Sequence, residues 1–136
     1  MSQPNFQDII DFHQKFGIEM PNKPQLLDPV TMDYRLKFLV EEHSEIIKGY
    51  FERDIHQVAD GLIDLVYVAM GTAYMMGLPW QALWDEVQRT NMSKQRAPSA
   101  EHSKRKNSLD IIKPEGWKQP DFTQWLGEQI QDKGSL

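Results

Sequence analysis

The chain has 136 residues, which suits one domain, and 40% of them are hydrophobic, which is enough to form a core. Its 20 acidic residues outnumber its 15 lysines and arginines, so the net charge of −5 argues against nucleic acid as a partner. It contains no cysteine, which excludes disulfides and thiolate metal sites and fits a reducing compartment. The first residues show no signal pattern, so we expect a cytoplasmic protein.

The first expected helix covers roughly residues 5–16, where the apolar side chains fall on one stripe and Gly17 provides the end. A connector with three prolines follows, at positions 21, 24 and 29. The second helix is expected over roughly residues 31–52. Its apolar side is formed by Leu36, Leu39, Val40, Ile46, Ile47 and Tyr50.

The third helix is expected from an N-cap at Asp54 to about residue 76, with Gly77 as a left-handed stop. Its run from Leu62 to Met70 is apolar nearly all round, which predicts burial on most sides, in a bundle or a subunit interface. The longest apolar segment, Leu62 to Leu78, contains Asp64 and two glycines, so we expect a buried helix and no membrane span. Pro79 suits the first turn of a fourth helix, which carries Trp80, Leu83, Trp84, Val87 and Asn91 on one face.

From residue 97 onward the character changes to a polar arm. Residues 99–108 are charged, residues 111–121 predict an ordered loop or short hairpin, and residues 122–131 predict a short helix. We therefore expect one all-α domain over residues 1–136, a four-helix bundle with a core of about 5–94 and an arm of about 97–136. Because three short partners cannot cover the third helix, we expect a homodimer or homotetramer that forms through the buried helices.

Two groups of carboxylates lie inside the apolar runs. Glu41, Glu42 and Glu45 share a face of the second helix, and Asp60 and Asp64 lie four apart on the third. If these helices pack antiparallel, both groups face one site. Carboxylates held close repel one another, and burial raises the cost of each charge, so a divalent cation with oxygen ligands would stabilise the cluster. The alternative interpretation is a solvated acidic face; two acids within the most apolar helix favour the metal site.

Asn91 and Lys94 follow the fourth helix in the sequence Asn-Met-Ser-Lys. Lysine is a point charge for phosphate, and asparagine can orient phosphate or sugar, although a lysine there also complements the helix dipole. His13, His43 and His56 are scattered without the spacing of a metal motif, which favours core or surface roles.

The motifs together resemble one family. Residues 41–45 resemble the EExxE signature of the all-α NTP pyrophosphohydrolases, which include MazG, the phosphoribosyl-ATP pyrophosphohydrolases and the dimeric dUTPases. Residues 60–67 resemble the second metal motif of this family. Residues 91–94 resemble the NMSK segment of small MazG-like proteins, many of which come from phages, and residues 113–121 resemble the C-terminal loop of those proteins. One position departs from the pattern: the usual ExxD has glutamate where this chain has Gly61, and Asp60 is the neighbouring substitute.

The resemblance implies a MazG-like fold and the hydrolysis of a nucleoside triphosphate to the monophosphate and pyrophosphate. Glu42, Glu45, Asp60 and Asp64 would hold Mg²⁺, for which Mn²⁺ could substitute, and Glu41 would be a ligand or the base that orients water. Lys48, Asn91 and Lys94 would contact phosphate or sugar, and Phe12 and Phe16 would hold the base. The leading expected substrates are dGTP and GTP. The expected location is the cytoplasm, which would be the host's for a phage protein.

Two other functions compete with this one. A di-iron carboxylate bundle needs Glu-x-x-His pairs, and no glutamate here has a histidine three residues later. A non-catalytic helical module, for nucleotide binding or protein interaction, remains the alternative; the intact acidic motifs argue against a loss of activity.

Overall fold

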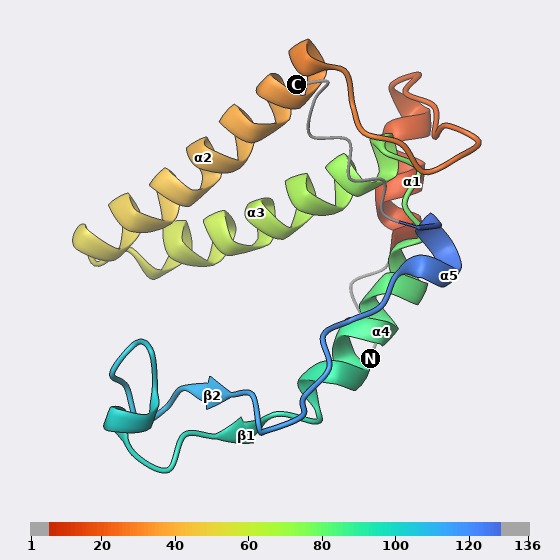
Figure 1. The fold of residues 1–136 in the computed structure, drawn as a ribbon. Helices are drawn as coiled ribbons and strands as arrows, with labels where there is room; N and C mark the ends of the chain where they lie inside the picture. Colours follow the sequence, from red (N-terminus) through yellow and green to blue (C-terminus); the bar gives the residue numbers. More distant parts are fainter. Residues whose placement is uncertain (1–5, 129–136) are drawn as a thin grey trace. The chain divides into compact units, whose positions relative to one another are not determined.

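The computed structural model describes residues 6–128, and these are mostly helical (Figure 1). The main helices are α1 (Phe6–Lys15), α2 (Pro29–Phe51), α3 (Ile55–Met75) and α4 (Trp80–Asn91). A two-stranded antiparallel sheet joins β1 (Gln95–Arg96) to β2 (Ile111–Ile112), with a 3-10 turn at Ala100–His102 between them, and α5 (Thr123–Leu126) follows. The all-α class is confirmed. Contacts divide the chain into two compact units, Met1–Trp80 and Gln81–Leu136, and each is described by itself.

Local capping explains where α2 and α3 begin. The Asp28 carboxylate accepts hydrogen bonds from the backbone N–H and the hydroxyl of Thr31, at 2.9 and 2.6 Å. Pro29 therefore opens α2, two residues before the predicted start, because a first-turn proline forgoes only an N–H that has no helical partner. At α3, the predicted cap is confirmed: Asp54 accepts from the backbone N–H of Gln57 at 3.1 Å. The predicted stop is confirmed by Gly77, whose φ is +70°.

Helices α2 and α3 form an antiparallel hairpin that is tightest at two glycines. A Cβ added at Gly49 would lie 3.0 Å from the backbone nitrogen of Val58. One added at Gly61 would lie 2.8 Å from Cγ1 of Ile46. Both distances are shorter than a normal van der Waals contact, so a side chain at either position would push the helices apart.

The core of the first unit lies where α1 meets the C-terminal half of α3. Ile9, Met70 and Tyr74 are buried there. Tyr74 also donates a hydrogen bond from its hydroxyl to the carbonyl of Ile18, at 2.8 Å, which ties the loop after α1 to α3. Partly buried side chains complete the cluster: Phe6, Ile10, Tyr67, Met75 and Trp80.

A buried polar cluster links α1, α2 and α3. The guanidinium of Arg35 donates from Nε to the hydroxyl of Thr72 at 3.0 Å and from Nη2 to the carbonyl of Val68 at 2.9 Å. Burial lowers the pKa of Arg35, and within residues 6–128 no carboxylate forms an ion pair with it. Gly71 provides the space: a Cβ there would lie 2.8 Å from Arg35 Nη2 and 3.0 Å from His13 Cε1.

Within one chain, the N-terminal half of α3 is not buried on most sides, so the bundle alone does not cover it and the predicted subunit interface stays a prediction. Ile55, Leu62 and Ile63 are 77%, 50% and 67% exposed, whereas residues from Val68 to Tyr74 are mostly buried. The reason is that α2 covers one side of α3, and the α1 cluster reaches only its C-terminal half. By length and composition α3 alone among the described helices could cross a membrane, a property that core helices of soluble proteins share.

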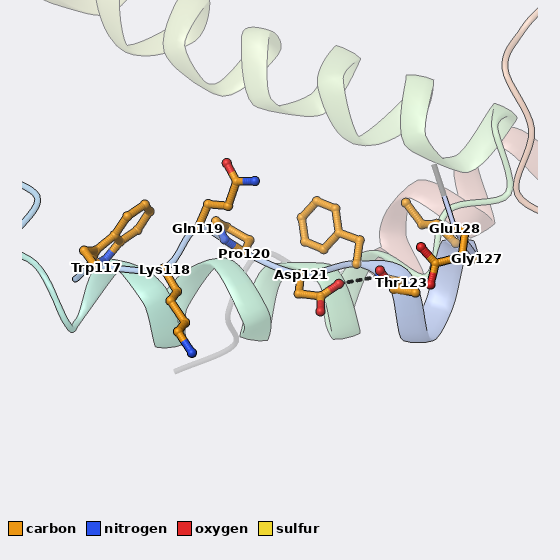
Figure 2. Close-up of a pocket in the computed structure, with 10 residues that line it drawn as sticks. Trp117, Lys118, Gln119, Pro120, Asp121, Thr123, Gly127 and Glu128 are labelled. Atoms are coloured by element: carbon orange, nitrogen blue, oxygen red, sulfur yellow. Dashed lines mark hydrogen bonds between the residues drawn. The ribbon is translucent and has the colours of Figure 1, made fainter. Parts of the chain in front are cut away.

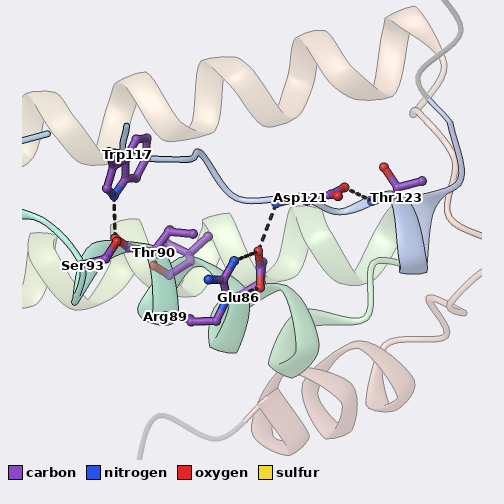
Figure 3. Close-up of polar contacts among 8 residues, drawn as sticks. Glu86, Arg89, Thr90, Ser93, Trp117, Asp121 and Thr123 are labelled. Carbon is purple, nitrogen blue, oxygen red and sulfur yellow. Dashed lines mark hydrogen bonds and ion pairs between the residues drawn. The ribbon is translucent and has the colours of Figure 1, made fainter. Parts of the chain in front are cut away.

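In the second unit, the segment after β2 runs back along α4 (Figure 3). The indole of Trp117 donates to the carbonyl of Thr90 at 2.9 Å. Glu86 pairs with Arg89 at 2.7 Å and accepts the backbone N–H of Asp121 at 3.1 Å. Residues 111–121 were predicted to be an ordered loop or a short hairpin, and they form no hairpin of their own, because β2 pairs with β1 at residues 95–96. The remainder of the segment, residues 113–121 after β2, contains no strand. The predicted terminal helix is reduced to α5, and its expected end, residues 129–131, lies outside the described residues.

Candidate active site

The predicted carboxylates lie on the facing helices of the hairpin. Glu42 on α2 and Asp64 on α3 are half-buried, one turn along their helices from the contact between Ile46 and Gly61. Because the helices are antiparallel, Glu42 and Asp64 turn toward each other. Asp60 is exposed, so the expectation that both aspartates lie where water is scarce holds for Asp64 and is wrong for Asp60.

Like-charge repulsion acts on two of the predicted acids, Glu42 and Asp64. The pKa of Glu42 is raised first by burial and then by the charges of Asp64, Glu41, Asp60 and Glu45. The pKa of Asp64 is raised by burial and by the charge of Asp60. The charges of the other four predicted carboxylates therefore act on Glu42, two of them from the facing helix α3.

Gln57 is a site residue that the sequence analysis did not identify. Its side-chain amide donates to the Glu45 carboxylate at 2.8 Å and to the Glu45 carbonyl at 3.3 Å. The contact fixes the direction of Glu45, although that side chain is exposed. The signal was available in the spacing: Gln57 lies seven residues before Asp64 and therefore on the same face of α3.

The donor set fits a hard divalent cation by its chemistry. Carboxylate oxygens are the ligands that Mg²⁺ and Mn²⁺ prefer, and a cation between the helices would offset the repulsion that raises the pKa of Glu42. The side chains are not yet gathered into a coordination shell: among residues 6–128, no three histidine, aspartate or glutamate side chains form a group that could hold a metal ion. Ligation would therefore require these side chains to turn further toward one another.

The predicted base-binding residues lie in α1 (Phe12) and in the turn directly after it (Phe16). The rings of Phe12 and Phe16 are 4.9 Å apart, and Phe12 meets Tyr67 of α3 edge-on at 5.4 Å. Phe12 and Phe16 are 44% and 59% exposed, which leaves aromatic surface free to stack. Lys48 is exposed in the last turn of α2. His13 is buried, whereas His43 and His56 are exposed, as the scattered spacing led us to expect.

The predicted phosphate contacts at the end of α4 belong to the second unit. Asn91 is exposed and is the last residue of the helix, and its carbonyl accepts the backbone N–H of Lys94 at 3.1 Å. Lys94 is half-buried, with its ammonium 5.1 Å from the centre of the Trp117 ring.

The second unit also contains a cavity that none of these residues lines. It has a volume of about 930 Å³ and is lined by the segment from Trp117 to Glu128 (Figure 2). Within this segment the Asp121 carboxylate accepts the backbone N–H of Thr123 at 2.9 Å. None of the predicted site residues lines the cavity, so its size alone does not mark it as the active site.

Comparison with known families tests the resemblance. A model of the phosphoribosyl-ATP pyrophosphohydrolase family matches residues 9–91, more than half of the chain, and the match includes α2, α3 and all five carboxylates. The chain belongs to this family. Membership identifies it as a pyrophosphohydrolase of the MazG-related all-α type that acts on nucleotides. No curated protein matched the chain.

Proposed function

We propose that this pyrophosphohydrolase cleaves nucleoside and deoxynucleoside triphosphates to the monophosphate and pyrophosphate, with Mg²⁺ as its cofactor and Mn²⁺ as a substitute. The observation that carries the proposal is the position of half-buried Glu42 on α2, which experiences charge repulsion from Glu41 and Glu45 on its own helix and from Asp60 and Asp64 on α3. Such a cluster is stabilised by a cation that also binds phosphate oxygens.

The residues divide by position. Glu42, Glu45, Asp60 and Asp64 would hold the metal, and Gln57 holds Glu45 in place through its hydrogen bond. The bound cation would lower the pKa of water and neutralise charge on the phosphate oxygens. Glu41, which is exposed beside Glu42, orients the attacking water and accepts its proton.

The reaction balances in a single displacement. The water oxygen bonds to the α-phosphorus, the bond from that phosphorus to the bridging oxygen breaks, and pyrophosphate leaves with the bridging oxygen. The water proton passes to the carboxylate base. Lys48, Asn91 and Lys94 supply contacts for phosphate or sugar.

In this proposal the substrate base stacks on the exposed aromatic surface at the C-terminal end of α1 and the turn that follows it. Phe12 and Phe16 present that surface, and their rings lie against each other at 4.9 Å. Guanine remains the leading base, in dGTP or GTP. The rings support stacking with any base, so a specificity screen across canonical and modified NTPs and dNTPs is the measurement that decides.

We also propose that the chain assembles through α2 and α3. The exposed apolar residues along α2 and α3 favour a homodimer or homotetramer, because an apolar surface of this extent is usually covered. They include Val40, Ile47, Tyr50, Leu62, Ile63 and Val66. The proposed location stays the cytoplasm.

The test is pyrophosphate release from an NTP panel, with Mg²⁺, with Mn²⁺ and with EDTA. Glu42→Gln and Glu45→Ala should each lower turnover at least about a hundredfold, a barrier change of roughly 2.7 kcal/mol, while helical circular dichroism stays unchanged. Glu52→Gln is the matched control, because Glu52 caps the same helix outside the cluster. Full turnover in EDTA, or in both cluster variants, would refute the metal assignment. Nucleotide binding without turnover would instead support the non-catalytic module.

A further inference from the structure

Positive charge is concentrated in one stretch of this acidic chain. Residues 94–113 contain six lysines and arginines against two acidic residues, a net charge of +4, which leaves −9 for the rest of the chain. This stretch comprises β1, β2 and the loop between them. Its charge is therefore a local feature that the overall composition conceals.

The side chains of this stretch surround a cavity of about 450 Å³, which we call the basic pocket. Its polar lining consists of Lys94, His102, Lys104, Arg105, Asp110 and Lys113. The strands bring two of them together: Gln95 pairs with Ile112, so Lys94 and Lys113 are the next residues outward on each strand. Both ammonium groups lie over the ring of Trp117, at 5.1 and 4.9 Å from its centre.

The single carboxylate of the pocket is already occupied. Asp110 accepts two hydrogen bonds from Arg105, at 2.8 and 3.0 Å, and one from the Ser103 hydroxyl at 2.6 Å. These hydrogen bonds lower the pKa of Asp110, with the Ser103 contact the largest cause. Within residues 6–128, no ion pair involves Lys94, Lys104 or Lys113. Three lysines thus border one cavity without an ion-pair partner, and their positive charge favours a bound anion.

We propose that the basic pocket binds an oligophosphate, either pyrophosphate or the phosphate chain of a nucleotide. Lysine ammonium groups act as point charges that suit compact phosphate groups, and several charges close together suit a ligand with several negative charges. The cavity exceeds the size of one phosphate group. Lys94 is already a proposed phosphate contact; Lys104, Arg105 and Lys113 are new ones. The inference depends on the second unit alone and not on hydrolysis at α2 and α3.

The experiment is calorimetric titration of the full chain in EDTA, which prevents metal-dependent turnover, with pyrophosphate and with a non-hydrolysable nucleoside triphosphate as separate ligands. Lys104→Gln/Lys113→Gln removes two charges from the pocket. Lys106→Gln/Lys118→Gln is the matched control, because it removes the same charge from the same unit at residues that do not line the pocket. Thermal melting checks that both variants fold.

Pyrophosphate should bind the parent chain at one site per chain and bind the pocket variant about tenfold more weakly or worse, as expected for two lost close charges. The control variant should stay within about twofold of the parent, since neither of its lysines lines the pocket. If the triphosphate binds more tightly than pyrophosphate and the pocket variant loses that binding, the phosphate chain of a nucleotide is the ligand. Absence of binding in EDTA, or an equal loss in both variants, would overturn the proposal. Preferential binding of single-stranded DNA through the same lysines would also overturn it. Because turnover plays no part, a failed hydrolysis assay leaves this result unaffected.

Discussion

Gly61→Ala tests how closely α2 and α3 pack. The added Cβ would lie 2.8 Å from Cγ1 and 3.4 Å from the backbone nitrogen of Ile46. Carbon atoms in favourable contact are about 3.5–4.0 Å apart, so the first distance is short by roughly 0.7 Å or more. Cγ1 belongs to a β-branched side chain that is stiff in a helix, so it cannot simply swing away.

Two opposing contributions determine the change in stability. Overpacking of this kind costs about 1–3 kcal/mol, whereas alanine is favoured over glycine in a helix by about 1 kcal/mol. We therefore expect Gly61→Ala to lower the free energy of unfolding by up to about 2 kcal/mol. Urea denaturation followed by circular dichroism measures the change.

A double-mutant cycle isolates the contact. Ile46→Ala removes Cγ1, so Gly61→Ala in that background should stabilise by about 1 kcal/mol. The coupling energy between the two positions should then be about 1–3 kcal/mol. Equal effects of Gly61→Ala in both backgrounds would show that the helices do not meet here. Gly61→Glu, which recreates the usual ExxD spacing, should destabilise the hairpin more than alanine does.

Three further predictions concern charge and assembly. Asp64→Asn should raise the melting temperature in EDTA, because it relieves charge repulsion, and it should weaken Mn²⁺ binding. Asp60→Asn should change the melting temperature and the Mn²⁺ affinity less, because Asp60 is exposed. A lower melting temperature of Asp64→Asn in EDTA would count against the shared site. Light scattering should give at least twice the chain mass of 15.9 kDa, whereas a stable monomer at micromolar concentration would contradict the predicted interface. The pKa of Glu86 lies below its ordinary value of 4.5, because Arg89 and a backbone N–H donate hydrogen bonds to the carboxylate. The ionised carboxylate therefore stabilises the fold fully above pH 4.5, and this stabilisation is lost as the pH falls through the lowered pKa. An NMR titration that finds the ordinary pKa for Glu86 would contradict these hydrogen bonds.

Local chemistry made the helices predictable. Asp54 and Gly77 cap α3 through contacts with near neighbours, so their residue types were enough to locate its ends. Pro29 misled the prediction, because a proline that ends a connector is also a favourable first residue of a helix. The carboxylate faces followed from spacing alone, since residues four apart share a side.

Contacts between distant segments were not predictable in this way. Gln57 reaches Glu45 twelve residues away, and strands of two residues have too little periodicity to reveal that they pair. The exposure of Ile63 shows a second limit of prediction from sequence. An apolar helix indicates that another surface covers it, but not that this surface belongs to the same chain.

The buried cluster at Arg35 has a consequence for how related sequences can vary. Position 71 can carry a side chain only if position 35 or position 13 yields space, because the guanidinium and the imidazole fill the volume that a Cβ would need. A change at Arg35 would in turn leave the Thr72 hydroxyl without its donor and open a hole beside α1. We therefore expect residues 13, 35 and 71 to vary together among related sequences, so that the packing of α1, α2 and α3 at this point changes as one unit.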